Sequence, residues 1–206
     1  MKKWLVAGLL FCLQWAAGAQ EPKSIAGIPA DVYYLMPSFG NGYIYFRGQM
    51  PAQGQLNICA VDNTIHYMDK GEELVSAPTE NIIKVRIDTV SFLHSQGVFY
   101  RLYPVTAEKG VALRRKVNLK TDEKEGAFGT TSRTSATKEY GVLYADGVSY
   151  NLNSNKTYPY EVSENLYLYH GDKILALNKK NLKKLFPEVQ FETLPKTLED
   201  ALALLR

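Results

Sequence analysis

The sequence predicts a mainly β protein built from antiparallel sheets, as a sandwich or a barrel-like meander, with short helices at its C-terminal end. Stretches rich in Tyr, Val and Ile alternate between apolar and polar residues, and Gly and Asp turns interrupt them at short intervals. Helical spacing is confined to the last 30 residues or so. No strand–helix–strand rhythm occurs, which argues against a parallel nucleotide-binding sheet.

Residues 1–19 have the order of a secretory signal peptide. Two lysines come first, an apolar run from Trp4 to Leu13 follows, and small residues end the segment at Ala19. This apolar run is half as long as the roughly 20 residues that a membrane-spanning helix needs. We therefore expect cleavage before Gln20, export to the periplasm or the outer surface, no lipid anchor, and no transmembrane segment in the mature chain.

Removal of the signal peptide changes the charge and the cysteine content. It takes away two of the 24 Lys+Arg and none of the 21 Asp+Glu, so the net charge falls from +3 to +1. A nearly neutral chain gives no electrostatic reason to expect a nucleic-acid partner. Cys59 is the one remaining cysteine, so the mature chain has no internal disulfide and must depend on its hydrophobic core.

The N-terminal region, residues 20–120, is expected to form an antiparallel meander. We place its first connection at Pro51–Gly54 and a hairpin turn at Asp69–Gly71, because glycine accepts the positive φ of tight turns. The expected strands are residues 43–47, 55–61, 64–68, 81–88, 98–103 and 111–117.

Residues 121–139 form a polar connecting segment, and hairpins and helices follow in residues 140–206. The connecting segment contains a single large apolar residue, Phe128, so it buries too little apolar area to offset its ordering entropy. Hairpin turns are expected at Asp146–Gly147 and Gly171–Asp172, the second between strands at residues 165–170 and 173–177. Residues 179–186 are expected to form a short helix that Pro187 ends, and Thr197 is expected to cap a last helix.

No arrangement of residues in the sequence spells out a catalytic or metal site, so we predict a non-enzyme without cofactor or metal. The three histidines are far apart and never in the H-x-x-x-H or H-x-H spacing of metal ligands. Cys59 lies in an expected strand, where cysteine is usually a small buried hydrophobe rather than a nucleophile. Glycosidase carboxylates at the required separation stay open as an alternative. The histidines are His66, His94 and His170.

Four lysines lie beside apolar residues in the expected helix at residues 179–186. Such a stripe is typical of an interfacial helix on anionic lipid or of an ordinary amphipathic helix packed on a sheet. We favour the second interpretation, because two helical turns are short for an anchor, and expect no peripheral membrane contact. The lysines are Lys179, Lys180, Lys183 and Lys184.

Several stretches resemble a group of exported Bacteroidetes proteins without assigned activity. The resemblance is carried by Leu56–Thr64, Met68–Leu74, Val85–Asp88, Phe99–Arg101, Gly126–Ser135 and Lys180–Pro187. It implies an envelope location in a Gram-negative bacterium and implies no substrate. In such proteins the Gly-aromatic-Gly stretch recurs between two β-rich halves.

That recurrence gives the segment GAFG a structural interpretation. We expect Phe128 to occupy an apolar groove, with Gly126 and Gly129 allowing close approach of the backbone, so that the segment is a clasp between the halves.

Tyrosine-rich strands are the expected binding surface. They indicate a non-catalytic binding or assembly protein of the cell envelope, with a protein or a glycan as partner; the alternative is a hydrolase of envelope or glycan polymers. Alternate strand positions place Tyr167 and Tyr169 on one face, although cross-strand packing would explain them equally. The expected binding residues are Tyr158, Tyr160, Tyr167 and Tyr169.

Overall fold

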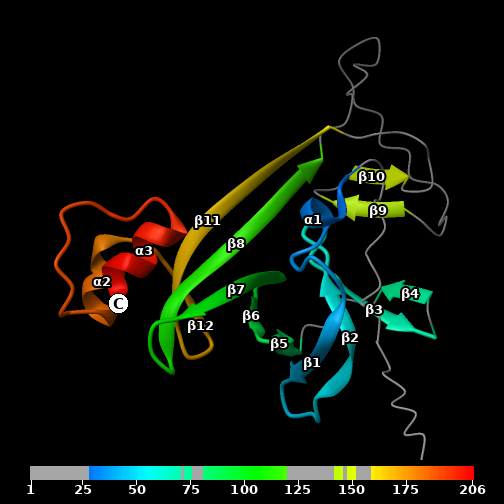
Figure 1. The fold of residues 1–206 in the computed structure, drawn as a ribbon, viewed down its shortest axis with the longest axis horizontal. Helices are drawn as coiled ribbons and strands as arrows, with labels where there is room; N and C mark the ends of the chain where they lie inside the picture. Colours follow the sequence, from blue (N-terminus) through cyan, green and yellow to red (C-terminus); the bar gives the residue numbers. More distant parts are fainter. Residues whose placement is uncertain (1–27, 71, 76–80, 120–141, 146–147, 152–158) are drawn as a thin grey trace, which may run out of the picture.

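The computed structural model describes residues 28–70, 72–75, 81–119, 142–145, 148–151 and 159–206 (Figure 1). Ten strands form one antiparallel sheet in the order β12-β11-β8-β7-β6-β5-β1-β2-β3-β4, and β10 and β9 form a separate pair. The two outermost strands of this order, β12 and β4, do not pair with each other, so the described sheet is open. The predicted fold class, mainly antiparallel β with short C-terminal helices, is confirmed.

The strand and helix bounds follow the chain order. The strands are β1 (Gly40–Phe46), β2 (Ala52–Ile58), β3 (Ile65–Asp69), β4 (Glu72–Val75), β5 (Ile82–Ile87), β6 (Val90–Ser95), β7 (Val98–Pro104), β8 (Lys109–Leu119), β9 (Val142–Ala145), β10 (Val148–Asn151), β11 (Tyr160–His170) and β12 (Lys173–Ala176). The helices are α1 (Ala30–Tyr33), α2 (Lys179–Leu185) and α3 (Leu198–Leu205).

Two-residue turns join the strands at the centre of the sheet. Asp88 and Thr89 connect β5 to β6, and Gln96 and Gly97 connect β6 to β7. Gln96 and Gly97 have φ of 52° and 74°, the left-handed conformation that matches the twist of paired strands. These tight turns fix the register, and register decides which side chains share a face.

A long two-stranded ribbon, made of β8 and β11, connects the two halves of the chain. The strands pair over eleven positions, from Lys109 with His170 to Leu119 with Tyr160. β7 pairs only with residues 110–113 of β8, so the far half of the ribbon extends past the end of β7. Strands from both predicted regions, β1 to β8 and β11 to β12, therefore share one sheet.

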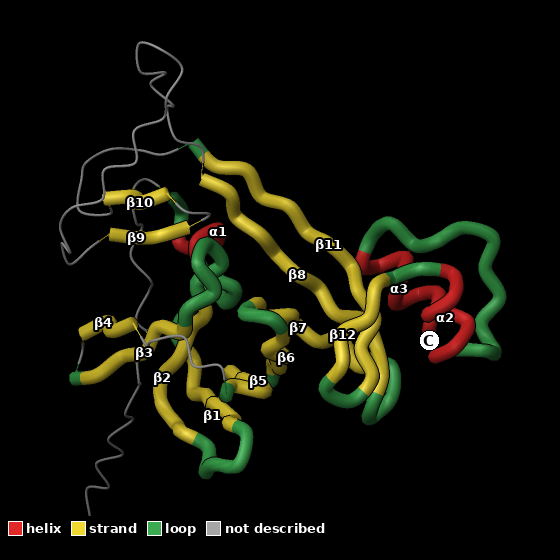
Figure 2. Tube along the Cα trace, turned by 180° about the vertical axis from the view of Figure 1, so that it is seen from behind, coloured by secondary structure: helices red, strands yellow, loops and turns green. Residues whose placement is uncertain are grey.

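The short helix α1 lies between the far half of the ribbon and the end of β2, as Figures 1 and 2 show. Val117 of β8 packs in the same core cluster as Tyr33 of α1 and Cys59 at the end of β2. The backbone is pinned there as well, because Leu35 N–H donates to Ile58 O at 2.9 Å and Ala60 N–H donates to Tyr33 O at 2.8 Å. Helix α1 thus packs between the far half of the ribbon and the end of β2.

Helices α2 and α3 cover the other end of the ribbon. Leu182, Phe186 and Ala201 are fully buried against Val111 of β8 and Leu168 of β11. Asn178 caps α2 by accepting a bond from Asn181 N–H at 2.8 Å, and the predicted cap Thr197 accepts from Asp200 N–H at 3.1 Å. No helix of the described residues is long and apolar enough to cross a membrane.

Three expectations about the strands were wrong. Residues 52–54 belong to β2, so the first connection is Arg47–Pro51 rather than Pro51–Gly54. Residues 90–95 form β6, to which the sequence pattern assigned no strand, because Ser91, His94 and Ser95 weaken the apolar alternation. β11 begins at Tyr160 rather than at residue 165, because its polar outer half is held by pairing with β8.

Candidate functional site

One face of the β7–β8–β11 sheet forms a cleft, which we call the ribbon cleft. Its floor follows from strand register: Arg101 pairs with Leu113, Leu113 with Leu166, and Arg115 with Glu164, so alternate residues of three strands face the same side. The floor residues are Arg101, Tyr103, Leu113, Arg115, Glu164 and Leu166.

Two segments far apart in the sequence make the walls of the ribbon cleft. They are Leu35, just after α1, and residues 196–199 at the start of α3. Phe92 of β6 extends the floor, because it pairs with Arg101. The enclosed volume is about 420 Å³, which falls within the range of about 300–1,000 Å³ for small-molecule sites. The long ribbon, α1 and α3 are therefore all needed to shape this hollow.

Among the described residues, some charged groups that line the ribbon cleft form an ion pair with each other, and others do not. Arg115 Nε lies 2.9 Å from Glu164 Oε1, and Arg115 Nη1 donates to the carbonyl of Asp31 at 3.1 Å. The Arg101 guanidinium lies 5.4 Å from the centre of the Tyr103 ring, in a cation–π arrangement. Lys196 and Glu199 line the rim and are exposed.

The phenol of Tyr103 stays protonated at neutral pH. Burial raises its pKa above the usual value, and the nearby positive charge of Arg101 offsets only part of this effect. Its hydroxyl is therefore available as a hydrogen-bond donor, beside an aromatic ring and a guanidinium group. In one cleft, two leucines, an aromatic ring and cations without an ion pair among the described residues can hold a polar ligand that has apolar faces and an acidic group.

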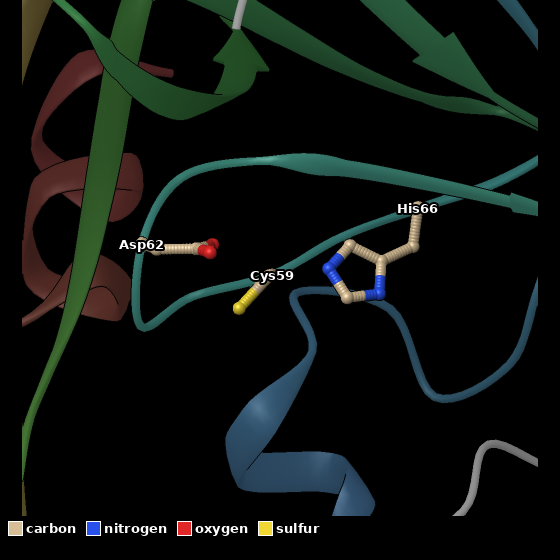
Figure 3. Close-up of side chains that lie close together, drawn as sticks. All are labelled: Cys59, Asp62 and His66. Atoms are coloured by element: carbon tan, nitrogen blue, oxygen red, sulfur yellow. The ribbon is translucent and has the colours of Figure 1, made fainter. Parts of the chain in front are cut away.

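A second group of functional side chains lies at the turn between β2 and β3, and we call Cys59, Asp62 and His66 the turn cluster (Figure 3). One ligand atom of each residue lies within 4.8 Å of the others. The hairpin explains the proximity, because Ile58 pairs with Ile65 and Cys59 N–H donates to Thr64 O at 2.9 Å. Cys59 and His66 are buried, and Asp62 is half-buried.

Hydrogen bonds run in one direction through the turn cluster. The Thr64 hydroxyl donates to Asp62 Oδ1 at 2.7 Å, so its lone pair accepts from His66 Nε2 at 3.1 Å. His66 Nδ1 then accepts from the Tyr34 hydroxyl, also at 3.1 Å. With the Thr64 hydroxyl donating to Asp62, these bonds place the imidazole proton on Nε2.

Cys59 is not arranged as a nucleophile. Burial raises the pKa of its thiol well above the usual value, and the Asp62 carboxylate adds to this rise. An active cysteine needs the opposite, a lowered pKa and a base bonded to its sulfur. His66 Nε2 is bonded to Thr64 instead, so the arrangement does not activate the thiol.

The tyrosines proposed for binding have different environments. Tyr160 is exposed at 37%, whereas Tyr169 is 5% exposed and packs in a core cluster with Tyr100. Tyr167 is half-buried and meets Tyr100 edge to face, with 5.2 Å between ring centres. Tyr158 lies outside the described residues, and so do Gly126, Phe128 and Gly129 of the expected clasp. Tyr160 is thus the one described member of the set whose ring is open to a partner.

The lysine stripe of α2 has the geometry of an ordinary amphipathic helix. Leu182, Leu185 and Phe186 are buried against the sheet, and the four lysines are exposed. Lys109 Nζ lies 4.6 Å from the centre of the Phe186 ring and donates to Leu185 O, which fixes the end of the helix.

Two features of these sites were missed in the sequence. The turn cluster has a signal in the spacing C-x-x-D-x-x-x-H, which a hairpin between residues 58 and 65 folds back on itself. The ribbon cleft has no local signal, because its residues come from segments up to 164 positions apart, from Leu35 to Glu199.

Comparisons of this chain with protein-family models, with curated proteins and with solved structures found no match.

Proposed function

We propose that the protein is an exported, non-catalytic binding protein of the bacterial cell envelope and that the ribbon cleft binds an acidic glycan. The observation that carries this proposal is the meeting of Tyr103, Arg101 and Lys196 beside the leucines of the floor, Leu113 and Leu166. The apolar faces of a pyranose ring pack on an aromatic ring, and an Arg guanidinium binds a carboxylate through two parallel hydrogen bonds.

The charge balance of the ribbon cleft favours an anionic sugar over a neutral one. Arg115 and Glu164 neutralise each other. The remaining lining charges are Arg101 and Lys196 against Glu199, which leaves one net positive charge. The carboxylate of a single uronic-acid unit would neutralise this remaining positive charge.

The binding surface extends from the ribbon cleft along β11. Tyr160 and Val162 occupy the same face as Glu164, because they are four and two positions before it in the strand. Both are exposed, at 37% and 42%. A strand rises about 3.3 Å per residue, so Tyr160 lies about 13 Å from Glu164 and can stack on a second part of a longer chain. This placement supports the binding role that we propose for Tyr160.

Glycan hydrolysis is the alternative reaction, and Glu164 and Glu199 are the carboxylates in the ribbon cleft. A glycosidase needs one carboxyl group that keeps its proton near neutral pH, which burial among apolar side chains provides. Here both glutamates are exposed, and Glu164 forms an ion pair with Arg115. This arrangement supports binding more than bond cleavage.

A protein partner is a second candidate, favoured by one observation on β11. β12 covers only residues 167–170 of this strand, and among the described residues no strand pairs with the outer edge of residues 162–166. A strand edge of this kind can accept a strand from another chain.

The test is calorimetric titration of the mature chain with an acidic tetrasaccharide containing uronic acid and with its carboxyl-reduced counterpart. We expect the acidic ligand to bind more tightly, Arg101→Ala to weaken its binding about tenfold or more, and the α2 surface variant Lys180→Ala to bind like the wild type. Equal affinity for both ligands, or unchanged binding by Arg101→Ala, would refute the proposal. New reducing ends in the reaction mixture would show a hydrolase instead.

A further inference from the structure

We propose that the turn cluster binds one zinc ion. The residue types fit this metal, because zinc is bound in proteins by thiolate, imidazole and carboxylate groups. Magnesium and calcium prefer oxygen ligands, so a sulfur and a nitrogen in a set of three argue against them. The three groups are Cys59, Asp62 and His66.

The distances in the turn cluster are close to those that zinc requires. Zinc lies about 2.3 Å from sulfur and about 2.0–2.2 Å from nitrogen and oxygen, which puts tetrahedral ligand atoms roughly 3.3–3.6 Å apart. The three ligand atoms already lie within 4.8 Å of one another, so each pair needs to close by roughly 1.5 Å at most. A hairpin of fixed register supplies them, so binding requires little ordering of the backbone.

The electrostatics of the turn cluster call for a cation. Among the described residues, no lysine or arginine forms an ion pair with Asp62, although its carboxylate is half-buried. A zinc ion with one thiolate and one carboxylate is a neutral unit, which a buried place accepts at little cost.

Neighbouring hydroxyl groups are placed to support the bound ion. Tyr34 already contacts His66 Nδ1 at 3.1 Å, so Nε2 is the ring atom directed at the Asp62 side of the cluster. When zinc occupies Nε2, Nδ1 carries the proton and donates it to the Tyr34 oxygen. Such a partner fixes the orientation of the imidazole. The Thr64 hydroxyl then keeps its bond to Asp62 and gives up the one to His66.

The role of this zinc ion would be structural. α1 covers the turn cluster, and Tyr33 and Tyr34 bury their rings against it. An ion that holds the turn rigid therefore also fixes the segment leading to Leu35, which forms a wall of the ribbon cleft. The inference stands independently of glycan binding, because it rests on other residues and another ligand.

The first experiment measures metal binding by the mature chain, using zinc alone and cobalt as a coloured substitute. We expect one zinc per chain, a Tm that rises with zinc concentration, and a thiolate-to-cobalt charge-transfer band in the near ultraviolet. Cys59→Ser should remove the band and the stoichiometric binding. Tyr34→Phe should weaken binding about 10–100-fold, as loss of an outer-shell partner does. His94→Gln and His170→Gln are the matched controls and should bind like the wild type.

The second experiment uses the wild-type chain, so it does not depend on whether variants fold. Long-range ¹H–¹⁵N spectra of the imidazoles should show His66 as the Nε2–H tautomer in chelator and as the Nδ1–H tautomer at zinc saturation. Zinc that leaves the His66 signals unchanged, or that shifts His94 or His170 instead, would overturn the proposal. So would a cobalt band that survives in Cys59→Ser. Failure of glycan binding would leave both zinc results unaffected.

Discussion

Arg115 on β8 and Glu164 on β11 lie opposite each other in register, with 2.9 Å between Nε and Oε1. The same guanidinium donates to the carbonyl of Asp31 at 3.1 Å. One side chain thus joins both strands of the ribbon to α1, at the edge of the hollow that the ribbon, α1 and α3 enclose. The shape of the ribbon cleft depends on this junction.

The junction predicts a graded response to mutation. Glu164→Gln removes only a partly exposed ion pair, which is worth about 0.2–1 kcal/mol, and its effect should fade at high salt. Arg115→Ala also removes the bond to Asp31, so it should lower the free energy of unfolding further, by about 1–2 kcal/mol in total. Urea unfolding measures both variants, with Lys180→Ala as an exposed control. Equal losses for the two variants would mean that the bond to Asp31 contributes nothing.

Ligand length tests the role of Tyr160. Because its ring lies about 13 Å along β11 from Glu164, it can contact only the longer ligands. Tyr160→Ala should therefore leave the affinity for an acidic disaccharide unchanged and lower that for a hexasaccharide about tenfold, as loss of an aromatic contact does. Calorimetry with both lengths checks this, and Met50→Ala, at 88% exposure in the connection between β1 and β2, is the control. A loss of equal size for both lengths would place the ligand elsewhere.

A buried amide should carry much of the stability around α1. Asn57 Oδ1 accepts from Met36 N–H and Ile58 N–H, and its Nδ2 donates to Met36 O. Asn57→Ala leaves these buried backbone groups without hydrogen-bond partners. We therefore expect the free energy of unfolding to fall by about 2–4 kcal/mol. Asn41→Ala changes an exposed side chain and should cost less than about 0.5 kcal/mol. A loss below about 1 kcal/mol for Asn57→Ala would show that water replaces the amide.

The thiol of Cys59 should make stability fall at alkaline pH in the presence of chelator. Burial raises its pKa in the folded chain, so ionisation favours the unfolded chain. The contribution of the protonated thiol to the free energy of unfolding is fully present below about pH 9. It is lost as the pH rises further, by up to about 1.4 kcal/mol per pH unit. Urea unfolding at pH 8, 9 and 10 should show this slope in the wild type and a shallower one in Cys59→Ala. Identical slopes would mean that the thiol titrates normally when folded.

The parts of the fold that local patterns determine were predicted well. Thr197 caps α3, Gly171–Asp172 turns β11 into β12, and α2 ends before Pro187, each because one residue type has a conformational preference that few neighbours alter. Strand β6 and the outer half of β11 were missed. Their strand conformation is imposed by pairing with neighbouring strands rather than by an alternation of apolar and polar residues.

The sites were harder to predict than the strands. The turn cluster needed the register of a single hairpin, and Cys59, Asp62 and His66 all lie within eight residues. The ribbon cleft needed the far half of the ribbon, the position of α1 and the start of α3 together. Such long-range pairings depend on summed packing, which no local pattern of the sequence contains.

The most direct test of the account is a ¹⁵N-resolved titration of the mature chain with the acidic tetrasaccharide. The account predicts saturable shifts centred on Arg101, Tyr103 and Lys196, with the ligand recovered intact. Shifts confined to residues outside the ribbon cleft and β11, or recovery of cleaved ligand, would contradict it.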